Sequence, residues 1–180
     1  MSRRARTLKA RTWLHLIAFA VPFAAALPWC LLMFTMDSFA VDSGQPLWGR
    51  LAVFRSQLAL FGGVGALAAQ AVALLSWPLL DRRAQKGGSA ATVGVFMAGL
   101  THALFGVLFV AMIVIGISLE GGDNSASFGD LVAMTVFFAV VSAIALGWLS
   151  FPLCVWFAHR IVARRRRELD RAPKVGSASV

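Results

Sequence analysis

The sequence predicts an all-α membrane protein in which four helices form a transmembrane bundle, and three observations support this prediction. The chain has 180 residues, of which 59% are hydrophobic, and a soluble domain this apolar could not cover its surface with polar groups. Four long apolar runs alternate with short polar segments. Fifteen of the 17 Lys and Arg residues fall in three of those short segments.

Each apolar run is long enough to cross a bilayer. A transmembrane helix needs about 20 apolar residues. In lipid such a segment must be helical, because every backbone N–H and C=O group needs a partner within the protein. We expect the spans at about residues 12–36, 53–80, 90–119 and 131–157. Short connections leave no room for a soluble domain between them.

The distribution of Lys and Arg predicts the orientation of the chain. The basic residues gather at the N-terminus, in the second connection and at the C-terminus, whereas the other two connections hold only Arg50 and Arg55 beside five acidic residues. Cytoplasmic loops carry the excess of positive charge, so both termini are expected in the cytoplasm. The net charge of +9 then reflects topology, and we expect no nucleic-acid partner.

The expected organisation has three parts, and the expected location is a bacterial-type inner (plasma) membrane, crossed several times. The parts are a basic cytoplasmic N-terminus (1–11), a four-helix transmembrane domain (12–160) and a basic, partly disordered cytoplasmic tail (161–180). A cleaved signal peptide is the alternative for the first span, because Ser38-Phe39-Ala40 resembles a cleavage site. The first apolar run is longer than the 7–15 residues of a signal core, so we expect this span to be retained.

Small residues four positions apart mark faces on which helices can pack closely. The second and third spans carry most of them, and the neighbouring helices of the same chain are the expected partners, with self-association as the alternative. The predicted helix-packing residues are Gly62, Gly65, Ala66, Ala69, Ala73, Gly94, Ala98, Gly99 and Ala103.

Four polar residues fall near the middle of the spans and are the candidate binding or proton-path residues: Gln70, Thr101, His102 and Ser142. Polar groups inside a membrane are often functional. Three interpretations compete: interhelical hydrogen bonds, a small binding site or proton step at His102, and ligation of haem or a metal. A bis-His haem needs two histidines that face each other, and His15 and His159 lie at similar depth near the cytoplasmic ends of their spans.

The second and fourth spans share a weak repeat, which we attribute to convergent use of Ser and Pro at helix ends, with two related helical hairpins as the alternative. Ser76-Trp77-Pro78-Leu79 ends one and Ser150-Phe151-Pro152-Leu153 ends the other. Each Pro is expected to bend its helix, with the preceding Ser hydroxyl bonding a carbonyl that the Pro frees. Trp148 lies too deep for the interfacial aromatic belt, and we expect it to pack between helices.

The function expected from the sequence is that of a non-enzymatic integral membrane subunit. We expect an accessory or immunity-type protein that binds another membrane protein, or a second copy, through its helices. No span contains an acidic residue, and no catalytic motif or zinc-ligand spacing is present. The alternative is a small oligomeric transporter or channel that uses the midplane cluster, and a haem or redox protein is third. No metal site is expected. No cofactor is expected for the subunit or for the transporter, and only the third alternative would hold haem.

The bilayer itself is the remaining expected partner. Arg164, Arg165, Arg166 and Arg167 follow the last span directly. Such a run fixes the topology of the span and attracts anionic headgroups, at about 1 kcal/mol per charge near the surface.

Overall fold

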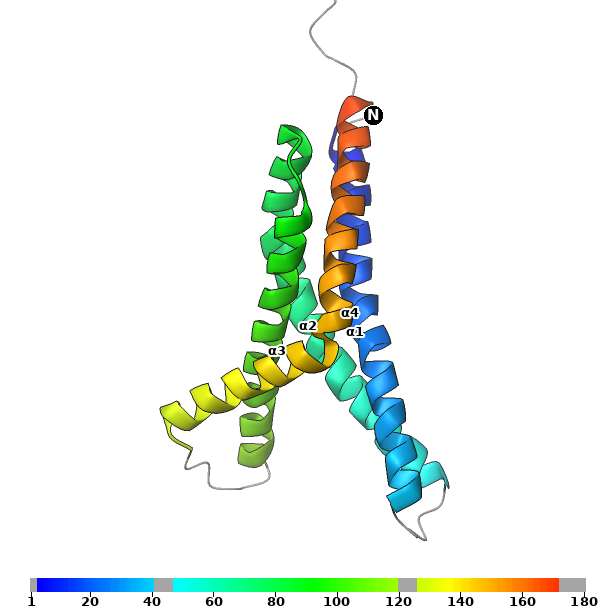
Figure 1. The fold of residues 1–180 in the computed structure, drawn as a ribbon, viewed down its shortest axis with the longest axis vertical. Coiled ribbons are helices and arrows are strands. Elements are labelled where there is room, and N and C mark those ends of the chain that lie inside the picture. The colour runs from blue at the N-terminus through cyan, green and yellow to red at the C-terminus, as the bar shows by residue number, and fades with distance from the viewer. Residues whose placement is uncertain (1–2, 41–46, 120–125, 172–180) are drawn as a thin grey trace, which may run out of the picture.

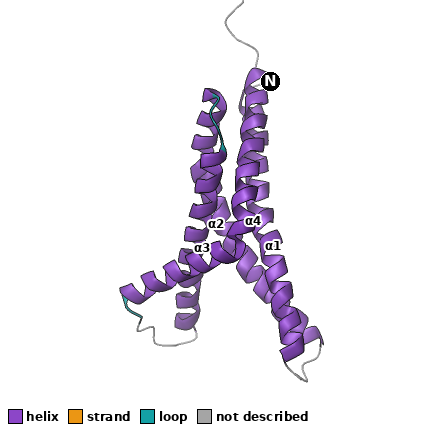
Figure 2. Cartoon of the chain, viewed as in Figure 1, coloured by secondary structure: helices purple, strands orange, loops and turns teal. Residues whose placement is uncertain are grey.

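The chain is a four-helix protein throughout the part that the structure describes. The computed structural model describes residues 3–40, 47–119 and 126–171, and these contain helices but no strand (Figures 1 and 2). All four helices are long and apolar enough to cross a membrane, which confirms the predicted fold class at that level. Their bounds are α1 Arg3–Ala40, α2 Leu47–Lys86, α3 Ala91–Leu119 and α4 Phe128–Asp170.

The helices are longer than the expected spans. α2 has 40 residues, which corresponds to about 60 Å of helix, whereas the hydrocarbon core is about 30 Å thick. α4 continues to Asp170, so residues 161–170, expected in a partly disordered tail, are helical. Residues 172–180 lie outside the described part of the chain. Glu120 and residues 121–125 of the connection between α3 and α4 also lie outside the described part.

The four helices pack together at one end of the molecule, which we call the basic end. It holds the N-terminal part of α1, the turn between α2 and α3, and the C-terminal part of α4 (Figure 1). All four helices contribute to the core there. Its buried residues are Leu14, Ala18, Val72, Ala73, Leu80, Ala84, Ala90, Val93, Met97, Ala158, Ile161 and Val162.

Away from the basic end the helices separate into two pairs, α1 with α2 and α3 with α4 (Figure 1). The two pairs are in contact where Phe61 of α2 stacks on Phe109 of α3, with the ring centroids 5.5 Å apart. Among the described residues α1 and α3 make no contact. The expected bundle therefore exists in one half of the molecule, and the other half consists of two diverging helical hairpins.

Glycine allows the closest contacts within each hairpin. A Cβ added at Gly62 of α2 would collide with the ring of Phe23, and one added at Gly65 would lie 3.0 Å from Pro22. In the other hairpin, a Cβ on Gly94 of α3 would lie 2.5 Å from the Cα of Val155 in α4. Helices that approach this closely gain dispersion contacts that larger residues would prevent.

The small residues predicted to pack fall into two groups. Gly62, Gly65 and Gly94 make the contacts just described; Ala66, Ala73 and Ala98 are buried, and Ala69 packs against the core. Gly99 and Ala103 instead lie on an exposed face of α3, and a Cβ on Gly99 would meet nothing within 4 Å. The small-residue pattern identified the helices that approach closely but did not distinguish the two faces of α3.

α4 begins with a capping box outside the predicted span. The Ser127 hydroxyl accepts a hydrogen bond from the backbone N–H of Asp130 at 3.2 Å. The Asp130 carboxylate accepts bonds from the Ser127 hydroxyl and backbone N–H at 2.7 and 2.9 Å. These bonds satisfy N–H groups that a helix start leaves unpaired, and they hold the pKa of Asp130 below its ordinary value of 3.8.

Candidate functional site

His102 of α3 is at the centre of one polar cluster and bridges two serines of α4. Its Nδ1 lies 3.0 Å from the Ser142 hydroxyl and its Nε2 lies 2.8 Å from the Ser150 hydroxyl. The His102 side chain is buried, and the ring of Phe151 stacks beside it with the centroids 6.1 Å apart. Both ring nitrogens are therefore engaged by the neighbouring helix.

The hydrogen bonds of this cluster suit a neutral imidazole. When Ser142 donates its proton to the carbonyl of Ala139 at 2.9 Å, its oxygen accepts from an N–H at Nδ1. Nε2 then accepts the proton of Ser150. A neutral His102 thus satisfies every donor and acceptor in the cluster, which is typical of a structural network. No ring atom is left to hold a ligand.

Gln70 forms a second, separate connection between α1 and α2. Its side-chain oxygen accepts a bond from Nδ1 of His15 at 2.7 Å, and its amide nitrogen donates to the backbone carbonyl of His15 at 2.7 Å. The two bonds fix the orientation of the Gln70 amide. They join α1 to α2 near the four-helix core.

The four predicted midplane residues therefore do not form one cluster. His102 and Ser142 come together, Gln70 pairs with His15 instead, and Thr101 donates to the Met97 carbonyl of its own helix at 2.8 Å. Depth counted along the sequence could not show which helix faces which. Ser150 was not expected in this site. From the sequence, its hydroxyl was expected to bond a backbone carbonyl freed by Pro152.

The two Ser-x-Pro-Leu segments behave differently. Ser150 bonds His102, whereas the Ser76 hydroxyl is fully buried and has no hydrogen-bond partner among the described residues. Neither hydroxyl bonds a carbonyl freed by proline, contrary to expectation. The expectation for Trp148 is also wrong, because this side chain is 75% exposed. Its indole N–H donates to the Ala145 carbonyl at 3.0 Å.

The arginine run after the last span packs against the α2–α3 turn. Arg165 donates to the Asp81 carboxylate at 2.6 Å, with only 11% of its side chain exposed. Arg166 donates to the carbonyls of Gly88 and Arg83 at 2.9 and 3.4 Å, where α2 ends and Gly87 adopts a φ of 76°. The guanidinium thus joins α4 to the end of α2 and to the turn that follows it.

The other two arginines of the run face outward. The Arg164 guanidinium lies 5.4 Å from the ring centroid of Trp13 in α1, a cation–π distance, and Arg167 is exposed. The run thus has two roles, with Arg165 and Arg166 holding α4 against α2 and Arg164 and Arg167 left near the surface. The signal for the packed extension was present in the sequence. Ala158, Ile161, Val162 and Leu169 repeat at helical spacing beyond the predicted end of the span.

The histidines considered for haem occupy different surroundings. Nδ1 of His15 is bonded to Gln70, and His159 is exposed. In residues 3–40, 47–119 and 126–171 no group of three or more His, Cys, Asp or Glu side chains could hold a metal ion. The haem alternative stays a prediction. Comparison with known proteins adds nothing to it, because no protein-family model, curated protein or solved structure matches this chain.

Proposed function

We propose that the protein is an integral inner-membrane subunit that binds a transmembrane helix of another membrane protein between its two hairpins. The observation that carries the proposal is the divergence of the hairpins beyond the contact of Phe61 with Phe109. Ile113 lies one turn further along α3 on the same side as Phe109 and is only half-buried. A Cβ added at Gly116, on the same side, would meet no atom of the described residues within 4 Å.

The pairing of polar groups supports a binding role. His102 bonds Ser142 and Ser150, and Gln70 bonds His15, so these side chains join helices of the chain to each other. On the diverging half of α3, Phe109 and Ile113 are apolar, whereas on α2 the polar Gln57 lies one turn beyond Phe61. Apolar and small side chains are the means by which helices associate in a bilayer. The transporter alternative stays a prediction from the sequence, without an observation that favours it.

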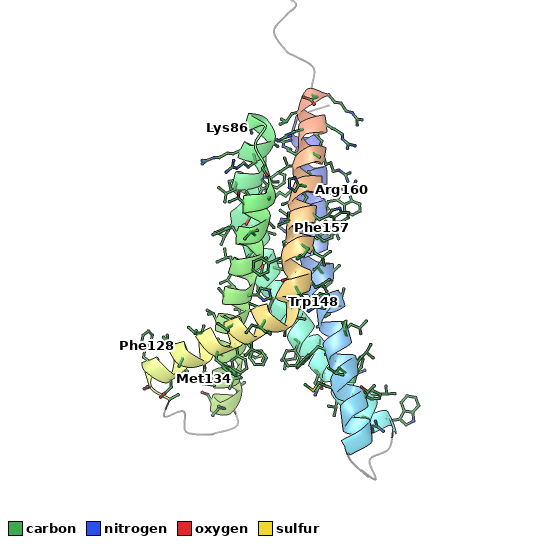
Figure 3. The ribbon with its side chains drawn as sticks, in the orientation of Figure 1. Lys86, Phe128, Met134, Trp148, Phe157 and Arg160 are labelled. Atoms are coloured by element: carbon green, nitrogen blue, oxygen red, sulfur yellow. The ribbon has the colours of Figure 1, made fainter. Side chains whose placement is uncertain are left out.

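The proposed orientation places the basic end in the cytoplasm. The basic residues around the α2–α3 turn and the C-terminal part of α4 lie at the same end as the start of α1 (Figures 1 and 3). Short loops rich in Lys and Arg stay on the cytoplasmic side. Arg164 and Arg167 would then face anionic headgroups, and the hairpins would open toward the outer leaflet.

A pair of photo-crosslinking variants tests the proposed binding face. A photoreactive amino acid at Ile113 faces the space between the hairpins, whereas one at Ile115 is about 200° further round the helix and 58% exposed. In native membranes we expect the Ile113 variant to form an adduct with an apolar segment of one partner protein. The Ile115 variant should label lipid. Equal adduct yields at the two positions, or none at Ile113, would contradict the proposal.

A further inference from the structure

The bonds of His102 require a bend in α4. Because both serine hydroxyls bond opposite sides of one imidazole ring, their oxygens lie within about 8 Å of each other. Ser142 and Ser150 are eight residues apart, and eight residues of straight helix rise about 12 Å. Figure 1 shows the result, a sharp change of direction that turns the N-terminal half of α4 away from the α1–α2 hairpin.

The sequence weakens the helix at the bend. Gly147 lies at the bend, and Pro152 removes the backbone N–H that would bond the Trp148 carbonyl. The exposed Trp148 occupies the bend in Figure 3, and its indole N–H bonds the Ala145 carbonyl. The His102 bonds join α3 to α4 at Ser142 and Ser150, before and after this weakened point.

The N-terminal half of α4, residues 128–145, is held mainly by α3. We call this segment the arm. It contacts α3 where a Cβ on Gly106 would lie 2.5 Å from the Thr135 carbonyl oxygen and where Phe109 meets Phe138 with centroids 4.8 Å apart. The far end of the arm projects from the molecule (Figure 3), and Phe128 there is 82% exposed.

The C-terminal half of α4 has neighbours on both sides. Ala158 and Ile161 belong to the core formed with Leu14 of α1 and Leu80 of α2, while Val155 contacts Gly94 of α3. A straight continuation of this half would therefore run between the two hairpins. The 30 residues from Asp130 to His159 would measure about 45 Å, enough to cross the bilayer unbent with some tilt.

We propose that α4 is a hinged arm with two positions, and that its straight position covers the face around Ile113. In the bent position, bonded to His102, this face is open to a partner helix. In the straight position the apolar arm itself occupies the space between the hairpins. The arm and the partner then compete for one surface, so the bonds of His102 regulate binding. The regulation of partner binding rests on the proposed function. The existence of two positions of α4 does not depend on it.

Distances between spin labels test the hinge in the purified chain in lipid nanodiscs. The labels are placed at Phe128 on the arm and at Thr35 on α1, both exposed, after Cys30 and Cys154 are replaced by alanine. We expect mainly the long distance in the otherwise unchanged chain. His102→Ala should raise the short-distance population relative to the long one about eightfold, because each interhelical bond shifts such an equilibrium about threefold.

Two further variants keep the test decisive. Ser150→Ala leaves His102 in place and should shift the populations about threefold, which covers the case in which His102→Ala fails to fold. Ser76→Ala removes the matching hydroxyl of α2, which has no partner, and should change nothing. Distance distributions that coincide for Ser150→Ala and the unchanged chain would overturn the hinge.

The occupant of the Ile113 face is tested in the same purified chain. With a photoreactive amino acid at Ile113, His102→Ala should increase an internal crosslink to residues 128–145 severalfold. An internal crosslink that does not increase while the label distance shortens would overturn coverage of this face by the arm. These experiments contain no partner, so they test the hinge separately from the proposed function. If the hinge works but no partner adduct forms at Ile113 in native membranes, the proposed function is refuted and the hinge is not.

Discussion

Replacing Gly94 with alanine is expected to lower the free energy of unfolding by about 2–4 kcal/mol. The new Cβ would lie 2.5 Å from the Cα of Val155, 2.8 Å from its nitrogen and 2.9 Å from the Cys154 carbonyl oxygen. These are backbone atoms of α4, so no side-chain rotation can relieve the collision and the two helices must separate. Reversible unfolding in mixed detergent micelles, followed by circular dichroism, measures the loss.

Gly99→Ala is the matched control on the same helix. Gly99 is exposed, and an added Cβ would meet no atom within 4 Å. Its replacement should change the unfolding free energy by less than about 0.5 kcal/mol. Equal losses for the two variants would mean that the α3–α4 contact at Gly94 does not form in the membrane.

The second large effect is expected at the basic end, where Arg165→Ala should cost about 1–3 kcal/mol of unfolding free energy. The Arg165 Nε lies 2.6 Å from the Asp81 carboxylate, and the two side chains are 11% and 25% exposed. Partial exposure of Asp81 keeps the cost below that of breaking a fully buried pair. The same unfolding measurement as for Gly94→Ala checks this loss. Combining Arg165→Ala with Asp81→Ala in a double-mutant cycle gives the coupling energy of the pair.

Arg167→Ala removes the same charge two residues further along and serves as the control. Arg167 is exposed, so the unfolding free energy should change by less than about 0.5 kcal/mol. Both variants remove one positive charge from the basic end, and a C-terminal topology reporter should respond alike to both. A coupling energy near zero between Arg165 and Asp81 would contradict the role of this pair in holding α4 against α2.

The number and type of the membrane-spanning segments could be predicted from the sequence, because the lipid environment determines them. Apolar run length gave four helices, because a backbone in hydrocarbon has no other regular structure available apart from a closed barrel. The ends were less predictable. Ile161 and Val162 extend the core past the expected last span, since a helix that leaves the bilayer continues wherever a neighbour, here α2, covers its apolar face.

The candidate site was predictable in its residue types but not in its pairings. His102 was placed near the midplane with Ser142 slightly further out, and the two do meet. The pairing of Gln70 with His15 was not foreseen, because it depends on how far α1 is displaced along α2. The role of Ser150 was missed for a related reason. Only the bend in α4 brings Ser142 and Ser150 to the same ring, and helix periodicity assumes a straight axis.

The central claim is that the chain works as one subunit of a complex with another membrane protein. Its most direct test is gentle purification from native membranes, followed by mass spectrometry that determines stoichiometry. We expect a different membrane protein in a fixed ratio to this chain, retained when Ile115 is changed to alanine and depleted when bulky tryptophan replaces Ile113. A homogeneous oligomer of this chain alone would contradict the claim.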